Sequence, residues 1–277
     1  MVGAQPDITV IDCMLTAPLR GALAANRPSA VLFHTFGGYW SRNFDRGPAG
    51  RALGLLGLRP RSLWDTASTR LMLTDAELDP SSSSPGLRNY TWVGSSETGE
   101  APLARGTRNR VLVALSATDW PGMLPVHRRI IAALETLPVD AVVTTGGVDL
   151  GGDLRGAPNV EVRGWVPHDE LLPTVDLVIG HGGHSTSLKA LAHGVPLLVL
   201  PINPISDQLH VGRTLEAAGV ARVLSRGSGA RDLRSTVVSM LADGRVRERA
   251  AATGHRLRQN APGGEVAAAR ILTTIRS

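Results

Sequence analysis

One stretch of this chain, residues 176–208, predicts a strand, a glycine-rich turn, a helix and a second strand in that order. The apolar run 177–179 is typical of a buried parallel strand, and the glycine-rich segment 180–186 follows it directly. Apolar residues then recur at helical spacing up to Gly194, and the run 197–200 is typical of the next strand. The unit is therefore βαβ, with its turn at the carboxyl end of a strand and the beginning of a helix.

That turn combines groups that bind anions. The first backbone N–H groups of a helix have no partner within the helix, and the helix dipole makes this end positive. Gly183 lets backbone approach a ligand closely, Ser185 and Thr186 supply hydroxyl groups, and His181 can donate a ring N–H. We predict a diphosphate site here. The glycine pattern alone is equally typical of a turn that binds no ligand.

A second pair of polar residues is expected at the same crevice. Asp207 and Gln208 follow the next strand, so their carboxylate and amide are expected beside the diphosphate. Such groups suit the hydroxyls of a sugar.

Segments 181–186, 190–196 and 207–208 together resemble the donor-binding signature of family-1 glycosyltransferases, GT-B enzymes that use nucleotide-activated sugars. The resemblance is greatest to the bacterial branch that modifies natural products, including antibiotics. It covers nearly all of residues 110–277 and, more loosely, residues 7–94.

The resemblance implies roles for further residues on the donor side. The Gly-Trp-Val-Pro segment 164–167 matches the element whose tryptophan stacks on the nucleotide base, an interaction that suits any base. The expected base contacts are Trp165, Val166 and His168. Ser116 and Thr118 follow an earlier predicted strand and are expected to contact the donor phosphates.

This chain departs from the family pattern at Lys189. Many members have a glutamate there that binds ribose hydroxyls, and a cation cannot accept those hydrogen bonds. Both UDP- and TDP-sugars therefore remain open as donors.

On the acceptor side, the resemblance gives Asp12 the role of the strand-end aspartate that orients a catalytic histidine. The family's own histidine lies in a segment further upstream, which this chain is expected to lack, so Asp12 resembles half of a dyad. Capping of the following turn is the alternative role. His34, at the end of the next strand, is a weaker candidate base, and Tyr39 and Trp40 suit either an apolar acceptor wall or a domain core.

Alternating strands and helices with short turns predict an α/β protein of the GT-B type with two Rossmann-like domains. We expect a truncated acceptor-side domain at 1–94, a linker at 95–108, and a doubly wound donor domain at 109–277. By resemblance, a long helical tail at 245–275 crosses back to the first domain.

Composition bounds the function further. The 277 residues include a single cysteine, Cys13, which excludes an internal disulfide and fits a cytoplasmic location. No apolar run approaches the length of a membrane span, and no secretion signal is evident. A net charge of +5 with scattered arginines does not indicate nucleic-acid binding.

These observations predict a hexosyltransferase that moves a sugar from a nucleoside diphosphate to a hydroxyl of a small, apolar acceptor with inversion and without a metal or other cofactor. The histidines at 181, 184, 193 and 210 have no familiar zinc spacing. Two alternatives remain open: a donor-binding module whose partner chain supplies the missing base, and a nucleotide-sugar epimerase. A homodimer is also compatible with the sequence.

Overall fold

The computed structural model describes residues 6–103 and 106–276. The described chain forms two compact units. Unit 1 comprises the residues up to Ser96 together with those from Asn260 onward, and unit 2 comprises Glu97–Gln259. Each unit contains its own parallel sheet, as expected for the α/β class.

The sheet of unit 2 has six strands in the order β10-β9-β8-β5-β6-β7, all of them parallel. The chain enters at β5, builds outward through β6 and β7, and then returns to β8 on the other side of β5. The strand order therefore reverses between β5 and β8, where doubly wound sheets open a crevice for ligands. The strands are β5 (Asn109–Ala114), β6 (Val139–Thr144), β7 (Val160–Arg163), β8 (Leu177–Gly180), β9 (Leu197–Val199) and β10 (Ala221–Val223).

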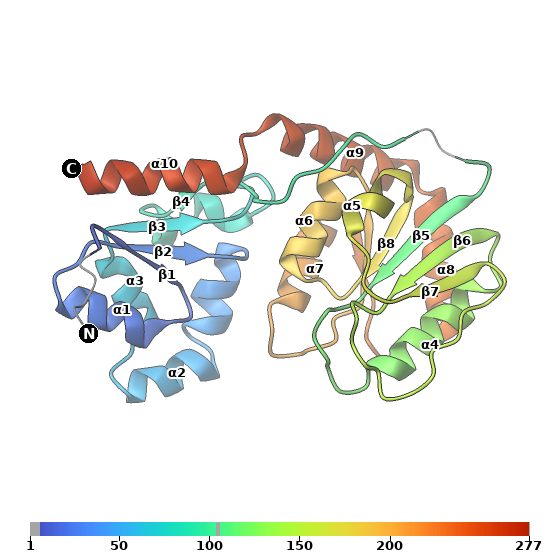
Figure 1. The fold of residues 1–277 in the computed structure, drawn as a ribbon, viewed down its shortest axis with the longest axis horizontal. Helices are drawn as coiled ribbons and strands as arrows, with labels where there is room; N and C mark the ends of the chain where they lie inside the picture. Colours follow the sequence, from blue (N-terminus) through green and yellow to red (C-terminus); the bar gives the residue numbers. More distant parts are fainter. Residues whose placement is uncertain (1–5, 104–105, 277) are drawn as a thin grey trace. The chain divides into compact units, whose positions relative to one another are not determined.

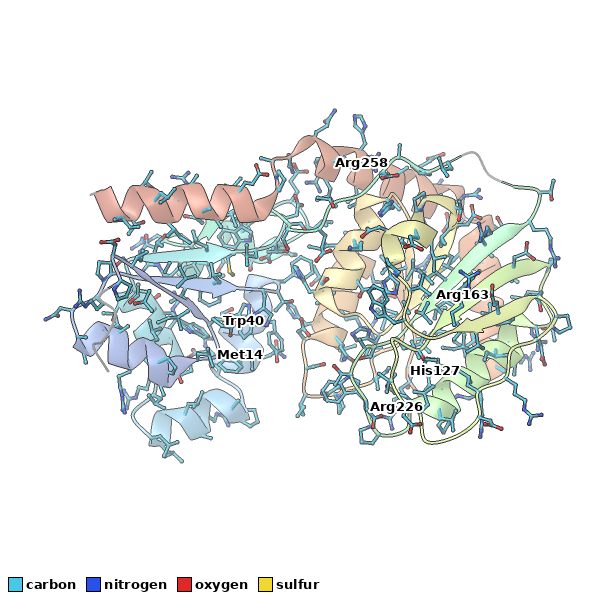
Figure 2. The ribbon with its side chains drawn as sticks, in the orientation of Figure 1. Met14, Trp40, His127, Arg163, Arg226 and Arg258 are labelled. Atoms are coloured by element: carbon cyan, nitrogen blue, oxygen red, sulfur yellow. The ribbon has the colours of Figure 1, made fainter. Side chains whose placement is uncertain are left out.

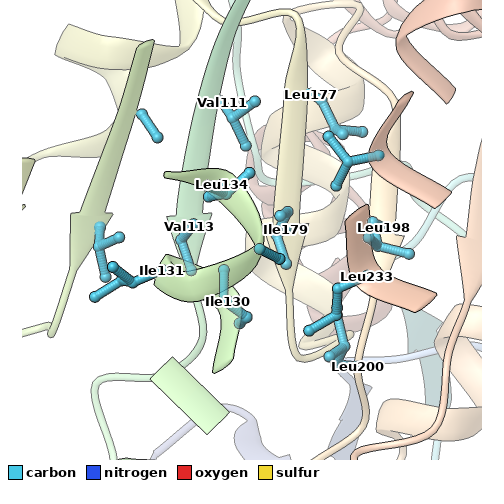
Figure 3. Packing of buried hydrophobic residues seen from close by; sticks show 14 of the residues in the cluster. Val111, Val113, Ile130, Ile131, Leu134, Leu177, Ile179, Leu198, Leu200 and Leu233 are labelled. Atoms are coloured by element: carbon cyan, nitrogen blue, oxygen red, sulfur yellow. The ribbon is translucent and has the colours of Figure 1, made fainter. Parts of the chain in front are cut away.

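Helices cover both faces of this sheet (Figure 1). Helices α4 and α8 pack together on one face, while α6 packs against α9. Figure 3 shows the core beneath α4 and α8, where aliphatic side chains of the helices meet those of alternate strand positions, such as Val113 and Ile179. The helices are α4 (Met123–Leu134), α5 (His168–Leu171), α6 (His184–Ala192), α7 (Gln208–Ala217), α8 (Ala230–Ala242) and α9 (Gly244–Gln259), with a 3-10 turn, η4 (Leu172–Thr174).

Unit 1 has a four-stranded parallel sheet in sequential order, β1-β2-β3-β4. Its core is aromatic: Phe33 contacts Trp40, Trp64 and Tyr90 at ring-centroid distances of 6.0, 5.1 and 5.2 Å. The elements are β1 (Thr9–Asp12), α1 (Thr16–Ala24), β2 (Ser29–Phe33), the π-helical turn η1 (Tyr39–Phe44), α2 (Pro48–Leu55), α3 (Pro60–Thr66), β3 (Thr69–Met72), the 3-10 turns η2 (Pro80–Ser83) and η3 (Pro85–Leu87), β4 (Thr91–Trp92) and α10 (Gly263–Arg276).

The carboxyl-terminal tail differs from the expected long helix, because it forms two helices separated at residues 260–262. Pro262 has no backbone N–H and restricts the residue before it, so one helix ends before it and another begins after it. The second helix, α10, packs against β3, and Ala267 lies in a small buried cluster with Leu71 and Val93 of unit 1.

Among the described residues, no helix combines the length and the apolar character that a membrane span requires.

Candidate functional site

A pocket of about 330 Å³ lies where the strand order of unit 2 reverses. It opens at the carboxyl ends of β5 and β8, because Ser116 follows the first of these strands and His181 follows the second. Seven residues predicted from the sequence line it: Ser116, Trp165, Val166, His168, His181, Ser185 and Thr186. A different hollow of about 390 Å³, lined by Arg110, Asp140 and Asn159, lies near the other ends of the strands. Parallel sheets bind ligands at their carboxyl ends, so the first pocket is the candidate site.

His181 is a neutral imidazole at the inner end of this pocket. Burial lowers the pKa of His181 to about 4, because a charged ring loses solvation there. Its Nδ1 atom is buried and has no hydrogen-bond partner among the described residues. The other nitrogen, Nε2, lies over Gly183, where any added Cβ would overlap it. A glycine at 183 is therefore needed for the ring to lie against the start of α6.

Gly182 is required by a second close approach. Its φ of +86° is in the left-handed region, and an added Cβ would lie 2.6 Å from the backbone oxygen of Gln208 and 2.8 Å from Val199 Cγ1. The turn between β8 and α6 is thus held tightly against the start of α7.

The first turn of α6 presents hydroxyl groups and backbone N–H groups together. Ser185 and Thr186 both line the pocket, and no side chain caps the helix at Gly183. Ser185 Oγ donates to Glu97 Oε1 at 2.7 Å, so this hydroxyl is held by a carboxylate. The backbone N–H groups and the dipole of a helix start attract an anion.

Ser116 and Thr118 separate in the structure. Ser116 lines the pocket, and its Oγ accepts a hydrogen bond from the backbone N–H of Thr118 at 2.9 Å. Thr118 itself is exposed and lies outside the described lining of the pocket. Its backbone therefore shapes the turn that presents Ser116.

The outer end of the pocket is formed by Trp165, Val166 and His168. Trp165 is 69% exposed, which leaves a large aromatic surface open to a planar ligand. The pKa of His168 is lowered, first by burial and then by the positive charge of Lys189, so its ring is neutral near pH 7. The pocket therefore joins an aromatic surface to a helix start that suits an anion.

Asp207 and Gln208 do not line this pocket as described. Gln208 is 4% exposed, and its Oε1 accepts hydrogen bonds from the backbone N–H groups of Ile202 and Asn203 at 2.7 and 2.9 Å. This carbonyl oxygen thus fixes the loop before α7, a role that the sequence analysis did not anticipate. Asp207 precedes α7 and makes no capping hydrogen bond with its side chain.

In unit 1, Asp12 has a histidine partner within this chain. Asp12 Oδ2 lies 2.9 Å from His34 Nδ1, and the backbone N–H of Met14 donates to Asp12 Oδ1 at 2.8 Å. The pair forms because β1 and β2 are parallel with Asp12 opposite Leu32, so both strands end at the same edge. The side chains of His34 and Asp12 are 49% and 41% exposed. A carboxylate thus orients a solvent-accessible imidazole.

The aromatic residues next to this pair belong mainly to the core. Trp40, labelled with Met14 in Figure 2, is 2% exposed and packs between Phe33 and Phe44. The ring of His34 lies edge-on to Trp40 with their centroids 5.0 Å apart. Tyr39 is half-buried beside Trp40. The structure therefore places Trp40 in the domain core, which is the second of the two roles that its sequence position suggested.

Asp12 and His34 also have a sulfur neighbour. One ligand atom of each of Asp12, Cys13 and His34 lies within 4.8 Å of the other two. This spacing is close enough for the three side chains to hold a metal ion. However, Cys13 is fully buried, and burial together with the charge of Asp12 raises its pKa far above the ordinary range of a thiol. Metal ligation requires the thiolate, so Cys13 is poorly suited to complete such a site.

One cluster on the pocket wall was missed as a site. Lys189 and Asp169 both line the pocket, and Lys189 Nζ lies 2.8 Å from Asp169 Oδ2 and 3.6 Å from Glu97 Oε2. The sequence indicated only Lys189, because Asp169 and Glu97 precede it by 20 and 92 residues. No local spacing pattern joins these three segments.

Comparisons with known proteins agree with this fold. Residues 128–270 match the family model "Erythromycin biosynthesis protein CIII-like, C-terminal domain". A demethyllactenocin mycarosyltransferase from Streptomyces fradiae is 39% identical over 100 residues, which are 35% of this chain and 21% of that protein. The matched stretch is thus about a fifth of that relative's length.

Solved structures extend the similarity to both units. The glycotransferase of kitacinnamycin superposes with a TM-score of 0.77 at 23% identity and covers 98% of this chain and 76% of its own. The glycosyltransferase VinC in complex with dTDP superposes with a TM-score of 0.69 at 23% identity, covering 99% and 73%. At this identity the likeness establishes the GT-B fold. With the family match over more than half of its residues, the chain belongs to the family-1 glycosyltransferases that carry an erythromycin biosynthesis protein CIII-like C-terminal domain.

Proposed function

We propose that this chain transfers a sugar from a UDP- or TDP-sugar to a hydroxyl of a small, apolar natural product, in the biosynthesis of an antibiotic or a similar compound. The observation that carries the proposal is the pocket between β5 and β8, which is lined by Ser185 and Thr186 of the first turn of α6, by His181 and by the exposed ring of Trp165. A nucleoside diphosphate offers the matching groups: a planar base at one end and two phosphates at the other. A cytoplasmic location stays a prediction.

The inner end of the pocket would stabilise the leaving nucleoside diphosphate. Negative charge grows on the diphosphate as the bond to the sugar breaks, so donors that are already in place lower the barrier. The N–H groups of α6, the hydroxyls of Thr186 and Ser116, and a ring N–H of neutral His181 would supply these donors. A chain that neutralises the diphosphate in this way needs no metal, which is why we propose a metal-independent reaction.

The acceptor hydroxyl needs a base, and the Asp12 and His34 pair is the best candidate in the described chain. With Nδ1 bound to the carboxylate of Asp12, Nε2 of His34 would accept the hydroxyl proton while Asp12 stabilises the imidazolium. Direct attack of the activated hydroxyl on the anomeric carbon is a single displacement, so the sugar would be transferred with inversion. Asp207 stays our candidate for a contact to the donor sugar.

The first experiment is titration of the purified chain with UDP, TDP and their glucose conjugates by isothermal calorimetry. We expect binding below millimolar concentration for at least one diphosphate and no comparable binding of uridine. If neither diphosphates nor nucleotide sugars bind, the proposed function is wrong.

Product analysis then separates transfer from the two alternatives. Incubation of a bound nucleotide sugar with a panel of small aromatic and macrolide alcohols should give a glycoside of inverted configuration. Binding without any glycoside would favour a donor-binding module, and release of an epimerised sugar without an acceptor would favour an epimerase.

A further inference from the structure

The wall of the candidate pocket contains two charged residues, Lys189 and Asp169, to which the proposed function gives no role. Lys189 lies between Asp169 and Glu97, with Nζ to oxygen distances of 2.8 and 3.6 Å. The side chains of Lys189 and Glu97 are mostly buried, at 24% and 19% exposure, whereas that of Asp169 is 54% exposed. Asp169 is therefore the carboxylate of this cluster that a ligand in the pocket can reach.

The cluster keeps a negative charge in spite of its lysine. One ammonium and two carboxylates sum to a formal charge of −1, the charge of a single glutamate. The hydrogen bond from Lys189 lowers the pKa of Asp169, so this carboxylate is ionised near neutral pH and accepts hydrogen bonds only. Lys189 therefore keeps Asp169 ionised, so the pocket retains a hydrogen-bond acceptor although residue 189 is a cation.

His193 holds Asp169 from a second direction. The backbone N–H of Glu100 donates to His193 Nδ1 at 3.2 Å, which places the imidazole hydrogen of a neutral ring on Nε2. That nitrogen lies 3.5 Å from Asp169 Oδ1, and His193 is 1% exposed. With one oxygen held by Lys189 and the other near His193, the remaining lone pairs of Asp169 are left for the pocket.

The position of the cluster along the pocket indicates which part of a nucleotide it meets. Lys189 lies one helical turn beyond Ser185 and Thr186 on the same face of α6, about 5 to 6 Å further from the helix start. Asp169 follows Trp165 by four residues and lines the same cavity. A group at Asp169 therefore lies between the expected positions of the diphosphate and the base, and this is where the ribose of a nucleoside diphosphate would lie.

We propose that Asp169 binds the hydroxyls of the nucleoside ribose, positioned by Lys189 and His193, and so makes the pocket select ribonucleotides over dideoxyribonucleotides. The inference rests on the proposed function, because it requires a nucleotide in this pocket. Glu97 has a separate role, because its carboxylate accepts from Ser185 Oγ and balances the charge of Lys189.

The test compares UDP with 2′,3′-dideoxy-UDP, which share the base and the diphosphate and differ only in the two hydroxyls. For the wild-type chain we expect UDP to bind about 10-fold more tightly, as hydrogen bonds to a charged group allow. Asp169→Asn should bring UDP to about the affinity of the dideoxynucleotide while leaving the latter unchanged. Glu170→Gln is the matched control, since this neighbouring carboxylate is exposed and outside the pocket lining.

Each outcome has one interpretation once circular dichroism has shown that the variants are folded. Equal binding of both nucleotides by the wild-type chain overturns the role of Asp169 but leaves the proposed function intact. An equal loss for both nucleotides in Asp169→Asn also overturns it, because a merely structural residue would behave in this way. Failure of the wild-type chain to bind either uridine nucleotide overturns this inference, and failure to bind TDP as well overturns the proposed function too.

Variants of Lys189 test its positioning role. Lys189→Arg keeps a cation beside Asp169 and should retain the preference for UDP, whereas Lys189→Met should lose most of it. If the ratio of the two affinities is the same in Lys189→Met as in the wild-type chain, Lys189 does not position Asp169.

Discussion

The two units place their candidate chemistry at the same kind of location but build it from different groups. In unit 2 the site lies where strand order reverses, and it depends on a helix start, close-packed glycines and a buried neutral histidine. In unit 1 the candidate is an exposed pair, Asp12 and His34, at the ends of adjacent strands. The candidate anion site thus depends on backbone geometry, which is local in sequence. The orientation of a base is encoded by a contact between segments.

Replacement of His34 is expected to change the rate of sugar transfer more than any other substitution in unit 1. Replacement by Gln removes the imidazole and should lower the rate of sugar transfer about 10²- to 10⁴-fold, the usual contribution of general base catalysis. Nucleoside diphosphate binding, measured by calorimetry, should not change, because His34 belongs to unit 1 and the lining of the candidate diphosphate pocket belongs to unit 2. A variant that transfers sugar at the wild-type rate would show that His34 is not the base. Asp12→Asn should show a smaller loss of the transfer rate, because the imidazole remains but its orienting carboxylate is gone.

The next effect concerns Gln208, whose contacts point to stability and not to catalysis. Gln208→Met keeps the size of the side chain but leaves the N–H groups of Ile202 and Asn203 without their acceptor. We expect the free energy of unfolding to fall by about 2 to 4 kcal/mol, as one buried and one half-buried donor lose their partner. Urea denaturation measures this, with the exposed Gln259→Met as control. If the variant is as stable as the wild-type chain but no longer uses the donor sugar, Gln208 contacts the sugar instead.

Two glycines that precede helices offer a matched pair for the anion site. Gly183→Ala would drive a Cβ into the ring of His181, whereas Gly229→Ala, before α8, meets no atom within 4 Å. Both glycines have negative φ, so backbone strain does not separate them. We expect diphosphate affinity to fall about 10-fold or more only in Gly183→Ala, by loss of one oriented donor. If the two variants bind the diphosphate with equal affinity, His181 does not contribute to anion binding.

The smallest effect is the pH dependence that His181 adds to stability. Its pKa is about 4 in the folded chain and about 6.5 when unfolded, so the unfolded state takes up the proton first as pH falls. Stability from the neutral ring is therefore complete above pH 6.5 and lost as pH falls toward 4. At pH 5.5 the loss should be about 1 kcal/mol relative to His181→Gln. A difference between wild type and variant that does not change from pH 7 to pH 5.5 would contradict the burial of this ring.

Much of the fold was predictable because its signals are local. Residues 177–200 combine an apolar strand, a glycine turn and a helical repeat, and the structure contains that strand, turn, helix and strand. The break of the tail at Pro262 had a visible signal, since proline ends helices, but the Ala-rich flanks favoured one continuous helix. Strand β10, only three residues long, is too short to show a clear pattern.

The site was predictable only in part. Residues near the turn could be placed from the sequence, but the partner of Asp12 depends on strand register, because residue 34 meets residue 12 only when β1 and β2 are aligned as observed. The bonds of Gln208 to a backbone loop and the balance of Lys189 by two carboxylates likewise require three-dimensional proximity. Sequence spacing does not contain that information.

The distribution of the five tryptophans has a practical consequence. Trp40 and Trp64 are buried among other aromatic rings, whereas Trp165 is 69% exposed on the pocket. Trp92 and Trp120 are half-buried, so Trp165 is the most exposed of the five. An indole in water emits at longer wavelength than a buried one, so Trp165 makes the largest contribution to the red edge of the spectrum. The chain thus carries an intrinsic optical probe at the mouth of its pocket, and a stacked base should quench that edge without any added label.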